Sequence, residues 1–523
     1  MSYLITLLLC VSLSQAQPGQ QPPKAGELFL QARQHFEKQE WDKARVAAAR
    51  ALQADPRLAD AEVMLGLIAS IEKQFGSAEQ HFLRAISLQP GNDLAQGYLA
   101  STYLQQKRYP EAARAFRKVL VRNPKNQAAN YNLGLIALIR EKPAEALKYF
   151  EQVSRQNPED VPALTGILEC RLLLKQSEAA LQLTRKLEAL LPPQDPALFR
   201  IATMLALYQQ YGPAIAILER LRQVYPQSHD VTYNLALAYL RAGKYDRAAE
   251  ALEPLLNQPG AAEAYSLLAQ AREKLQPGAQ ALQAYQKAAE LEPGNEDYRF
   301  DYACALLQYV PGDAAVTAFS SAVRDFPKSW RMRTGLGSAY YLTGRNEDAA
   351  AALLEAIKLD PASKVAYYLL GRAYEAAGSR QADIRAAFKA YLEREPRDPW
   401  AYYHCGSMLY LEAQTELTPD FKAARGCLGK ALALDPDFAE AHLQMGIIEQ
   451  AEGRLPEAVL SLERAIRISP DLPAPHYRLG QVYQRLGEKE RSRAEFDLFE
   501  KLKAGGALRE KQEVVRSLSE PRK

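Results

Sequence analysis

The residue types that carry most protein chemistry are sparse in this chain and stand far apart. Of its six histidines, His442 and His476 attract attention because they are 34 residues apart. A structural repeat of that length would bring the two imidazoles close together. A zinc site needs further ligands, however, and none accompanies this pair. The sequence therefore predicts that both rings pack in the core and that the chain binds no metal.

Four cysteines follow the N-terminal apolar segment, and their spacing matches no zinc motif. Cys405 and Cys427 are close enough in sequence to form a disulfide in an oxidising compartment. Buried free thiols are nevertheless the expected state of all four, Cys170 and Cys304 included.

Acidic pairs such as Glu440 and Glu449 fit solvated helix faces better than an acid–base pair, which would have to converge in a sheltered cleft. The chain contains no glycine-rich phosphate loop, no HExxH and no GxSxG. We therefore predict that it is not an enzyme and uses no cofactor.

Any function of these side chains depends on the internal repeat that positions them. Residues 131–152, YNLGLIALIREKPAEALKYFEQ, return in altered form as residues 233–254, YNLALAYLRAGKYDRAAEALEP. Apolar residues recur every three or four positions in both, which is typical of amphipathic helices. Prolines that end the second helical run recur mostly every 34 residues, at Pro56, Pro90, Pro124, Pro158, Pro192, Pro226, Pro259, Pro293, Pro327, Pro361, Pro396, Pro436 and Pro470. Such a period indicates a stacked-repeat protein.

Small and large residues alternate at fixed places when each proline is counted as position 32 of its repeat. Position 8 is small: Gly66, Ala100, Gly134, Ala236, Gly337, Gly371, Gly446 and Gly480. Position 20 is mostly alanine, and position 24 is bulky: Phe82, Phe116, Phe150, Tyr285, Phe319 and Phe496. Two helices cross closely only where neither carries a large side chain, and a ring beside the crossing fills the remaining space.

These residues resemble the tetratricopeptide repeat, a helix–turn–helix unit of 34 residues. The resemblance implies an all-α fold, an α-solenoid built as a right-handed superhelix of about fourteen stacked repeats over residues 25–503. Residues 504–523 are then expected to form a capping helix over the last repeat, through Leu508, Val514, Val515 and Leu518, followed by a tail. The fifth repeat departs from the pattern, with Leu168 at position 8 and Thr184 at position 24, and irregular packing is expected there.

The first residues differ from the repeats. An apolar run followed by Ser14-Gln15-Ala16 fits a secretory signal peptide over residues 1–16, and the Pro/Gln-rich residues 17–24 fit a tether. No Lys or Arg precedes the apolar run, so an uncleaved anchor remains the alternative, although the run is short for a membrane span. We expect an exported protein of the periplasm or cell surface of a bacterium, not membrane-spanning after signal cleavage.

In the resembled family the first helix of each repeat lines a concave groove through positions 2, 5, 9, 12 and 13. In repeats 2–7 these positions are largely apolar: Val63, Leu67, Ile71, Leu104, Tyr131, Leu135, Leu138, Phe199, Leu207, Tyr233, Leu237 and Leu240. In repeats 10–12 they are aromatic or arginine: Arg331, Tyr341, Tyr368, Arg372, Trp400, Tyr403 and Tyr410. Partner contact is expected at Tyr131, Leu135, Tyr233 and Leu237 and throughout the aromatic set, with core packing as the alternative.

The expected function is therefore that of an exported, non-enzymatic scaffold that binds a protein or peptide in this groove. The family resemblance suggests a role in envelope assembly, polysaccharide export or secretion. The alternative is a glycan-binding solenoid that uses the aromatic and arginine wall of repeats 10–12. The net charge of +3 and the lack of a basic stripe argue against a nucleic-acid partner.

Overall fold

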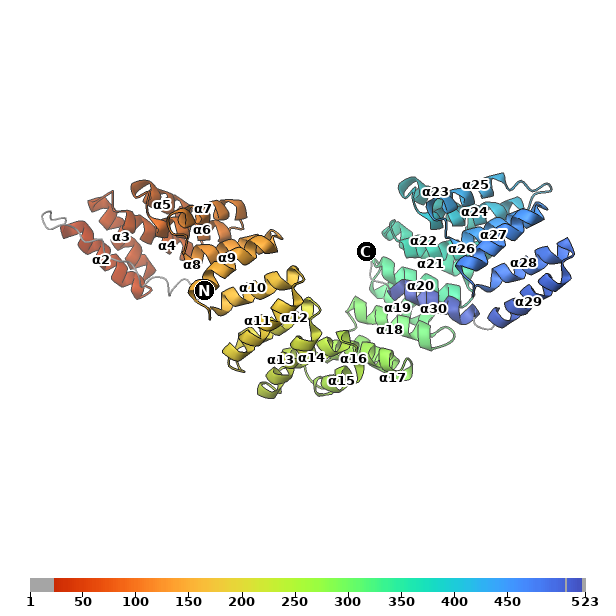
Figure 1. Ribbon diagram of the computed structural model, residues 1–523, viewed down its shortest axis with the longest axis horizontal. Coiled ribbons are helices and arrows are strands. Elements are labelled where there is room, and N and C mark those ends of the chain that lie inside the picture. Colours follow the sequence, from red (N-terminus) through yellow and green to blue (C-terminus); the bar gives the residue numbers. More distant parts are fainter. Residues whose placement is uncertain (1–22, 504–505, 520–523) are drawn as a thin grey trace. The chain divides into compact units, whose positions relative to one another are not determined.

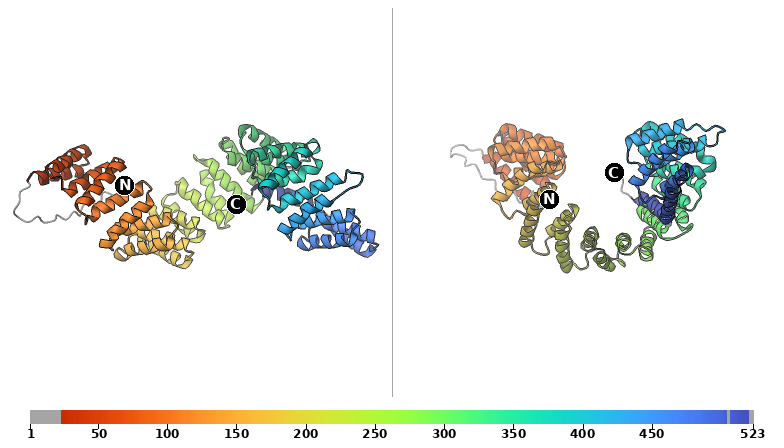
Figure 2. Two further views of the ribbon diagram at one scale, coloured as in Figure 1. Left: turned by 90° about the horizontal axis from the view of Figure 1, so that it is seen from above. Right: turned by 45° about the vertical axis from the view of Figure 1, so that its right-hand side comes forward.

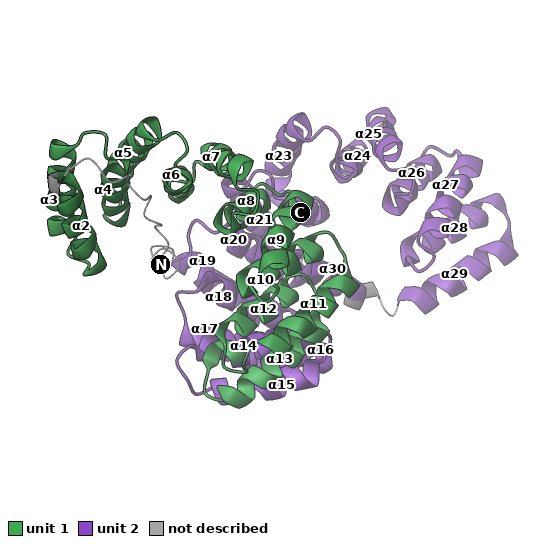
Figure 3. Ribbon diagram, turned by 60° about the vertical axis from the view of Figure 1, so that its left-hand side comes forward, with its two compact units in different colours: residues 1–231 green, residues 232–523 purple. Residues whose placement is uncertain are grey.

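The computed structural model describes residues 23–503 and 506–519, and within these ranges every regular element is a helix. The chain divides into two compact units, residues 1–231 and 232–523, and the division falls inside helix α14 (His229–Arg241) (Figure 3). The expected signal peptide at 1–16 lies outside the described residues. Helix α2 already begins at Pro23, inside the expected tether 17–24.

Unit 1 stacks helices in pairs, one pair to each repeat, in chain order (Figure 1). The pairs are α2 (Pro23–Glu37) with α3 (Trp41–Ala54), α4 (Ala59–Ile71) with α5 (Phe75–Leu88), α6 (Asp93–Gln105) with α7 (Tyr109–Arg122), α8 (Gln127–Ile139) with α9 (Pro143–Gln156), α10 (Val161–Leu173) with α11 (Ser177–Leu190), and α12 (Pro196–Leu207) with α13 (Tyr211–Val224). The second helices α3, α5, α7 and α9 also contact the first helix of the next pair. The apolar faces are thereby buried between successive repeats.

Unit 2 continues the same arrangement, which can be followed by colour in Figure 2. Its pairs are α14 with α15 (Tyr245–Leu252) and η2 (Glu253–Leu255), α16 (Ala261–Leu275) with α17 (Ala279–Leu291), α18 (Glu296–Tyr309) with α19 (Ala314–Asp325), α20 (Trp330–Leu342) with α21 (Asn346–Leu359), α22 (Lys364–Ala373), η3 (Tyr374–Ala376) and η4 (Gly378–Arg380) with α23 (Gln381–Arg394), α24 (Pro399–Ala413) with α25 (Lys422–Leu434), α26 (Ala439–Ala451) with α27 (Leu455–Ile468), and α28 (Pro473–Leu486) with α29 (Lys489–Lys503). The predicted all-α solenoid is confirmed.

The tightest helix crossings occur where a glycine faces a ring. A Cβ atom added to Gly134 would lie 2.7 Å from the ring of Phe150, and one added to Gly166 on the next first helix would lie 2.8 Å from it. Phe150 is fully buried between these two backbones. A methyl group at either glycine would therefore have to displace the ring.

In the fifth repeat, α10 and α11 contact each other less extensively than the paired helices of repeats 1–4 do, in keeping with the irregular packing expected there. Leu168 at position 8 and Thr184 at position 24 are both fully buried. A large residue at position 8 therefore stands with a small one at position 24, the reverse of the sizes in most other repeats. The Thr184 hydroxyl donates to the carbonyl of Ala180 at 3.0 Å and so remains satisfied.

The turn inside a repeat passes through the left-handed region at the same position in most repeats. Glycine occupies it in later repeats, with φ 74° at Gly243 and 76° at Gly344. Earlier repeats place other residues there, with φ 59° at Lys107 and 56° at Glu141. The reversal lets the next amide reach back to the ending helix, as the Lys142 N–H does to the carbonyl of Ala137 at 2.8 Å.

The C-terminal helix α30 (Gly506–Ser519) does not cap the array. It packs against α18, α20 and α22, the first helices of three successive repeats (Figure 1). Val514 is fully buried and Val515 is 8% exposed in that position. The expected capping of the last repeat by residues 504–523 is thus wrong. Val514 and Val515 do form an apolar contact as expected, but with the first helices of unit 2 rather than with the end of the stack.

We predict that Gly134→Ala lowers the free energy of unfolding by about 1–3 kcal/mol, because the added methyl group overpacks the crossing with Phe150. The matched control is Gly97→Ala in α6, where an added Cβ meets nothing within 4 Å. That change should be neutral or stabilise the helix by up to about 1 kcal/mol. Chemical denaturation of both variants measures the difference, and an equal response would contradict the crossing as the cause.

Candidate functional site

Large aliphatic residues at position 13 stay in solvent along unit 1. Each ends the first helix of its repeat, and together they form what we call the aliphatic stripe: Ile71, 43% exposed, Ile139, 52%, Leu173, 40%, and Leu207, 76%. The sequence had singled out Ile71 and Leu207 but missed Ile139 and Leu173, although all four share one register. Leu67, also expected in the groove, is only 5% exposed and belongs to the core.

The four residues predicted on α8 and α14 are each half-buried. The ring of Tyr131 meets that of Phe150 edge-on, with centroids 5.6 Å apart, so part of its surface serves the core. Burial and the neighbouring Glu263 carboxylate raise the pKa of Tyr233 above the ordinary tyrosine value. Leu135 and Leu237 keep part of their surface accessible. These side chains therefore combine packing with a partly open surface.

Three predicted residues of unit 2 form a polar group that we call the Arg372 cluster: Tyr341, Tyr368 and Arg372. The Arg372 guanidinium donates to the Tyr368 hydroxyl at 2.8 Å and to the Tyr341 hydroxyl at 3.3 Å. Its remaining N–H groups face α30, with Nη2 2.6 Å from Glu510 Oε1 and Nη1 3.3 Å from Glu513 Oε2. The hydroxyl of Tyr341 also donates to Glu510. The cluster predicted to bind a partner thus binds the chain's own C-terminal helix.

The protonation states of the cluster suit a carboxylate ligand. Burial works against the charge of Arg372, but the oxygens of Tyr368 and Tyr341 hold its pKa above the ordinary value. Burial and the Glu510 carboxylate raise the pKa of Tyr341, which therefore keeps its proton and can donate. A fixed cation that donates to two phenol oxygens, one of which donates onward to a carboxylate, is well matched to anionic side chains.

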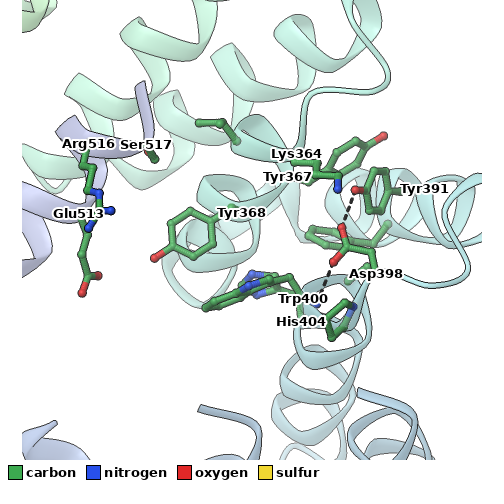
Figure 4. A pocket seen from close by; sticks show the side chains of 14 residues that line it. Lys364, Tyr367, Tyr368, Tyr391, Asp398, Trp400, His404, Glu513, Arg516 and Ser517 are labelled. Carbon is green, nitrogen blue, oxygen red and sulfur yellow. Dashed lines mark hydrogen bonds between the residues drawn. The ribbon is translucent and has the colours of Figure 1, made fainter. Parts of the chain in front are cut away.

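An aromatic group continues from this cluster into α24. The Tyr368 and Trp400 rings meet edge-on with centroids 5.0 Å apart, and Trp400 meets Tyr403 likewise at 5.7 Å. A cavity of about 560 Å³ lies between this group and α30, and Glu513 is among its lining residues (Figure 4). Asp398 fixes one wall of the cavity by accepting from the Tyr391 hydroxyl at 2.6 Å.

Arg331 and Tyr410 do not contribute to this arrangement as predicted. Arg331 pairs with Asp297, Nη1 to Oδ1 2.6 Å, and its guanidinium lies 4.4 Å from the Phe300 ring centroid. Tyr410 packs against Phe421 with ring centroids 5.2 Å apart. Both side chains are therefore engaged by residues of their own or a neighbouring repeat.

His404, which the sequence did not single out, is buried beneath the aromatic group. Its imidazole occupies the space that a Cβ on Gly371 would need, with Nδ1 2.3 Å from that position, and its Nε2 has no hydrogen-bond partner in the structure. Burial, reinforced by the nearby Arg372 charge, lowers the pKa of His404 to about 3. The one feature of the sequence that could have identified His404 is that a polar residue stands where the side chain packs against a glycine, Gly371.

His442 and His476 do not contact each other, and each forms a hydrogen bond with the carbonyl of a preceding proline. Nε2 of His442 lies 3.0 Å from the Pro436 oxygen, and Nε2 of His476 lies 3.1 Å from the Pro470 oxygen. A second contact joins His476 Nδ1 to Glu495 at 2.7 Å. The two imidazoles therefore satisfy carbonyls at the end of the preceding repeat.

Two other expectations are corrected. Cys405 and Cys427 form a disulfide that joins α24 to α25 across the longest connection within a repeat, whereas free thiols were expected. Cys170 and Cys304 are buried free thiols, as expected. Glu449, expected in solvent, is 8% exposed and accepts from the Ser461 hydroxyl at 2.7 Å, and its pKa is raised by burial.

Two general properties concern the described residues. No helix among them is both long and apolar enough to cross a membrane. In the same part of the chain, no group of three or more His, Cys, Asp or Glu side chains is arranged to hold a metal ion.

Family models described as tetratricopeptide repeat match residues 29–93, 99–153, 205–271, 312–364 and 343–399, and a TPR repeat model matches 448–487. The small glutamine-rich tetratricopeptide repeat-containing protein 2 of Mycosarcoma maydis is 32% identical over 85 residues, which are 16% of this chain and 24% of that protein. Yeast Tom70 aligns over 81% of this chain and 95% of its own, with 14% identity and a TM-score of 0.38. Pseudomonas aeruginosa pilF aligns over 40% and 95%, with 20% identity and a TM-score of 0.34.

We predict that the region around α24 loses stability as the pH falls. An unfolded histidine takes up a proton below its usual pKa, whereas buried His404 does not, so acid favours the open state. Between about pH 7 and about pH 4.5 the free energy of opening should fall by about 2 kcal/mol more in the native chain than in His404→Gln. Amide exchange of α24, corrected for intrinsic rates, measures this difference, and equal slopes would contradict the assignment to His404.

Proposed function

Because the chain belongs to the tetratricopeptide repeat family, we propose that it is a non-enzymatic scaffold that binds a segment of another protein along its first helices. The observation that carries this proposal is the aliphatic stripe of unit 1. A soluble surface seldom keeps large aliphatic side chains in one repeating register unless another molecule covers them.

The register of the stripe suits a chain-like ligand. Stacked helices lie roughly 10 Å apart, so the three successive repeats 4–6 present aliphatic contacts at regular intervals, whereas repeat 3 has Gln105 at this position. An extended peptide or an amphipathic helix can match such spacing with its own apolar side chains. The half-buried Tyr131 and Leu135 on α8 add apolar surface of the same kind.

The glycan alternative finds less support in the wall of repeats 10–12. Stacking on a sugar requires an accessible ring face, yet Tyr368, Trp400 and Tyr403 pack edge-on against one another. Phe438 also meets Trp400, with ring centroids 4.5 Å apart. Arg372, the wall's cation, is already paired with Glu510 and Glu513. These contacts favour a protein ligand.

Affinity capture from a cell-envelope extract tests the scaffold proposal. The bait is the chain from Gln17, compared with Ile139→Ser/Leu173→Ser/Leu207→Ser, and a partner should be lost from the triple variant because its apolar contacts are removed. The matched control is Leu88→Ser/Val121→Ser/Val224→Ser, which removes exposed aliphatic residues from second helices of the same unit. Loss from both variants, or from neither, would contradict a role of the stripe.

We further propose that the chain is exported and serves an envelope process such as assembly, polysaccharide export or secretion. The signal-like residues 1–16 support export, and so does the Cys405–Cys427 disulfide, because disulfides persist mainly in oxidising compartments. When the chain is expressed in a bacterial host, the intact mass of the periplasmic protein should equal that of a chain beginning at Gln17. It should lie below the fully reduced mass by two hydrogens, because one disulfide has formed. Recovery only from the cytoplasm, with Met1 retained and both thiols alkylatable, would overturn the export proposal.

A further inference from the structure

Helix α30 lies where a scaffold of this kind should receive a partner. It contacts α18, α20 and α22, which are all first helices and therefore groove-lining elements in the family. Resting on the proposed scaffold function, we propose that α30 is a tethered internal ligand that closes the groove of unit 2. We infer that the partner of this groove is an amphipathic helix that, like α30, presents two carboxylates one turn apart, and that it must displace α30 to bind.

Charge pairing gives the first reason. Glu510 and Glu513 are three residues apart, so they lie on one side of α30 and reach the two terminal nitrogens of Arg372. The phenol groups of Tyr341 and Tyr368 support the same guanidinium. An arginine held by two phenols presents its remaining N–H groups in a fixed direction, which selects for paired carboxylates.

Apolar contacts give the second reason. Val514 joins a buried cluster against which Tyr341 and Tyr368 pack, and Val515 joins another that contains Phe300 and Leu307 of α18. The sequence Glu510–Val515, EKQEVV, thus combines two carboxylates one turn apart with two branched aliphatic residues directly after them. A competing helix needs this combination, because the carboxylates fix the orientation and the aliphatic pair supplies buried area.

The way α30 is held suggests that it can leave. Among residues 509–518 only Val514 and Val515 are buried, whereas Gln512, Glu513 and Arg516 are exposed. Leu518 packs partly buried against the cluster that contains Val515. At the other end of the helix, Arg509 Nη1 lies 3.3 Å from Asp471 Oδ2, just before α28. A helix held by few buried side chains opens at lower free energy than the paired helices of the repeats. Its tether keeps its local concentration high, so it competes with any free ligand.

A synthetic peptide of residues 506–519, labelled with a fluorophore, tests this in trans on the full-length chain. In the native chain α30 blocks the site, so the peptide should bind weakly. In Glu510→Lys/Val514→Asp the chain's own helix is weakened, and the peptide should bind about tenfold tighter or more. Gln512→Lys is the matched control, because it adds the same charge at an exposed position of α30. It should bind the peptide as weakly as the native chain.

Arg372 provides the test of specificity. Adding Arg372→Glu to the loosened chain should abolish binding of the native peptide. A peptide carrying Glu510→Lys/Glu513→Lys should bind this chain but not the loosened chain that keeps Arg372. Such an exchange of charges restores binding only if the peptide occupies the site of α30. Equal binding of the native peptide to the native and loosened chains, or binding to neither, would overturn the proposal.

The native chain supplies a second measurement that needs no substitution in α30. Amide exchange at α30 should be faster than at α20, and about 1 M salt should accelerate it selectively by screening the Arg372 pairs. If α30 exchanges only together with α20 and α22, it is an integral part of the fold and the proposal fails. Capture of a partner through the aliphatic stripe is independent of this result, so the scaffold function would still stand.

Discussion

The close crossing of two helices over a single ring is the constraint on which the rest of this structure depends. Phe150 lies between the backbones of Gly134 and Gly166, at distances that leave no room for a methyl group on either. The same contact recurs where Gly66 meets Phe82 and, in unit 2, where Gly480 meets Phe496. Since no helix pair can bury its apolar face alone, each crossing commits the chain to another repeat. The period of the sequence is therefore a consequence of one steric fit.

The helix crossing requires that the side chains beside it have a certain total volume, but it does not require particular residue types. In the fifth repeat Leu168 and Thr184 exchange the usual sizes and both remain fully buried. In repeat 12 the imidazole of His404 occupies the space beside Gly371 that a hydrocarbon side chain fills elsewhere. The second solution carries a cost, since a buried imidazole without a partner for Nε2 must stay neutral. The array thus tolerates chemical variation wherever the sum of volumes is preserved.

The sequence predicted those features that depend on neighbours within one period. Helix pairing, the small residues at the crossings and the placement of Tyr341, Tyr368 and Arg372 on first helices all follow from the pattern inside a repeat or between adjacent repeats. The contact between Arg372 and Glu510 joins residues 138 positions apart, and no periodic pattern encodes it. The apolar face of α30 was visible in Val514 and Val515, but not the surface that it covers. Arg331 and Tyr410 share the register of the groove, yet Asp297 and Phe421 respectively engage them.

The fold of α30 onto unit 2 follows from a problem that every solenoid has. Its first helices face one another only along their edges, so their inner faces stay open unless another segment covers them. In unit 2 that face contains a cation, Arg372, held between two phenol groups, and leaving it uncovered would expose the aromatic surface around it. A short amphipathic helix covers both features at once, because two of its carboxylates meet the guanidinium while its valines enter the adjoining clusters. The chemistry that makes the inner face a binding surface is thus the same chemistry that makes it retain the chain's own C-terminal helix.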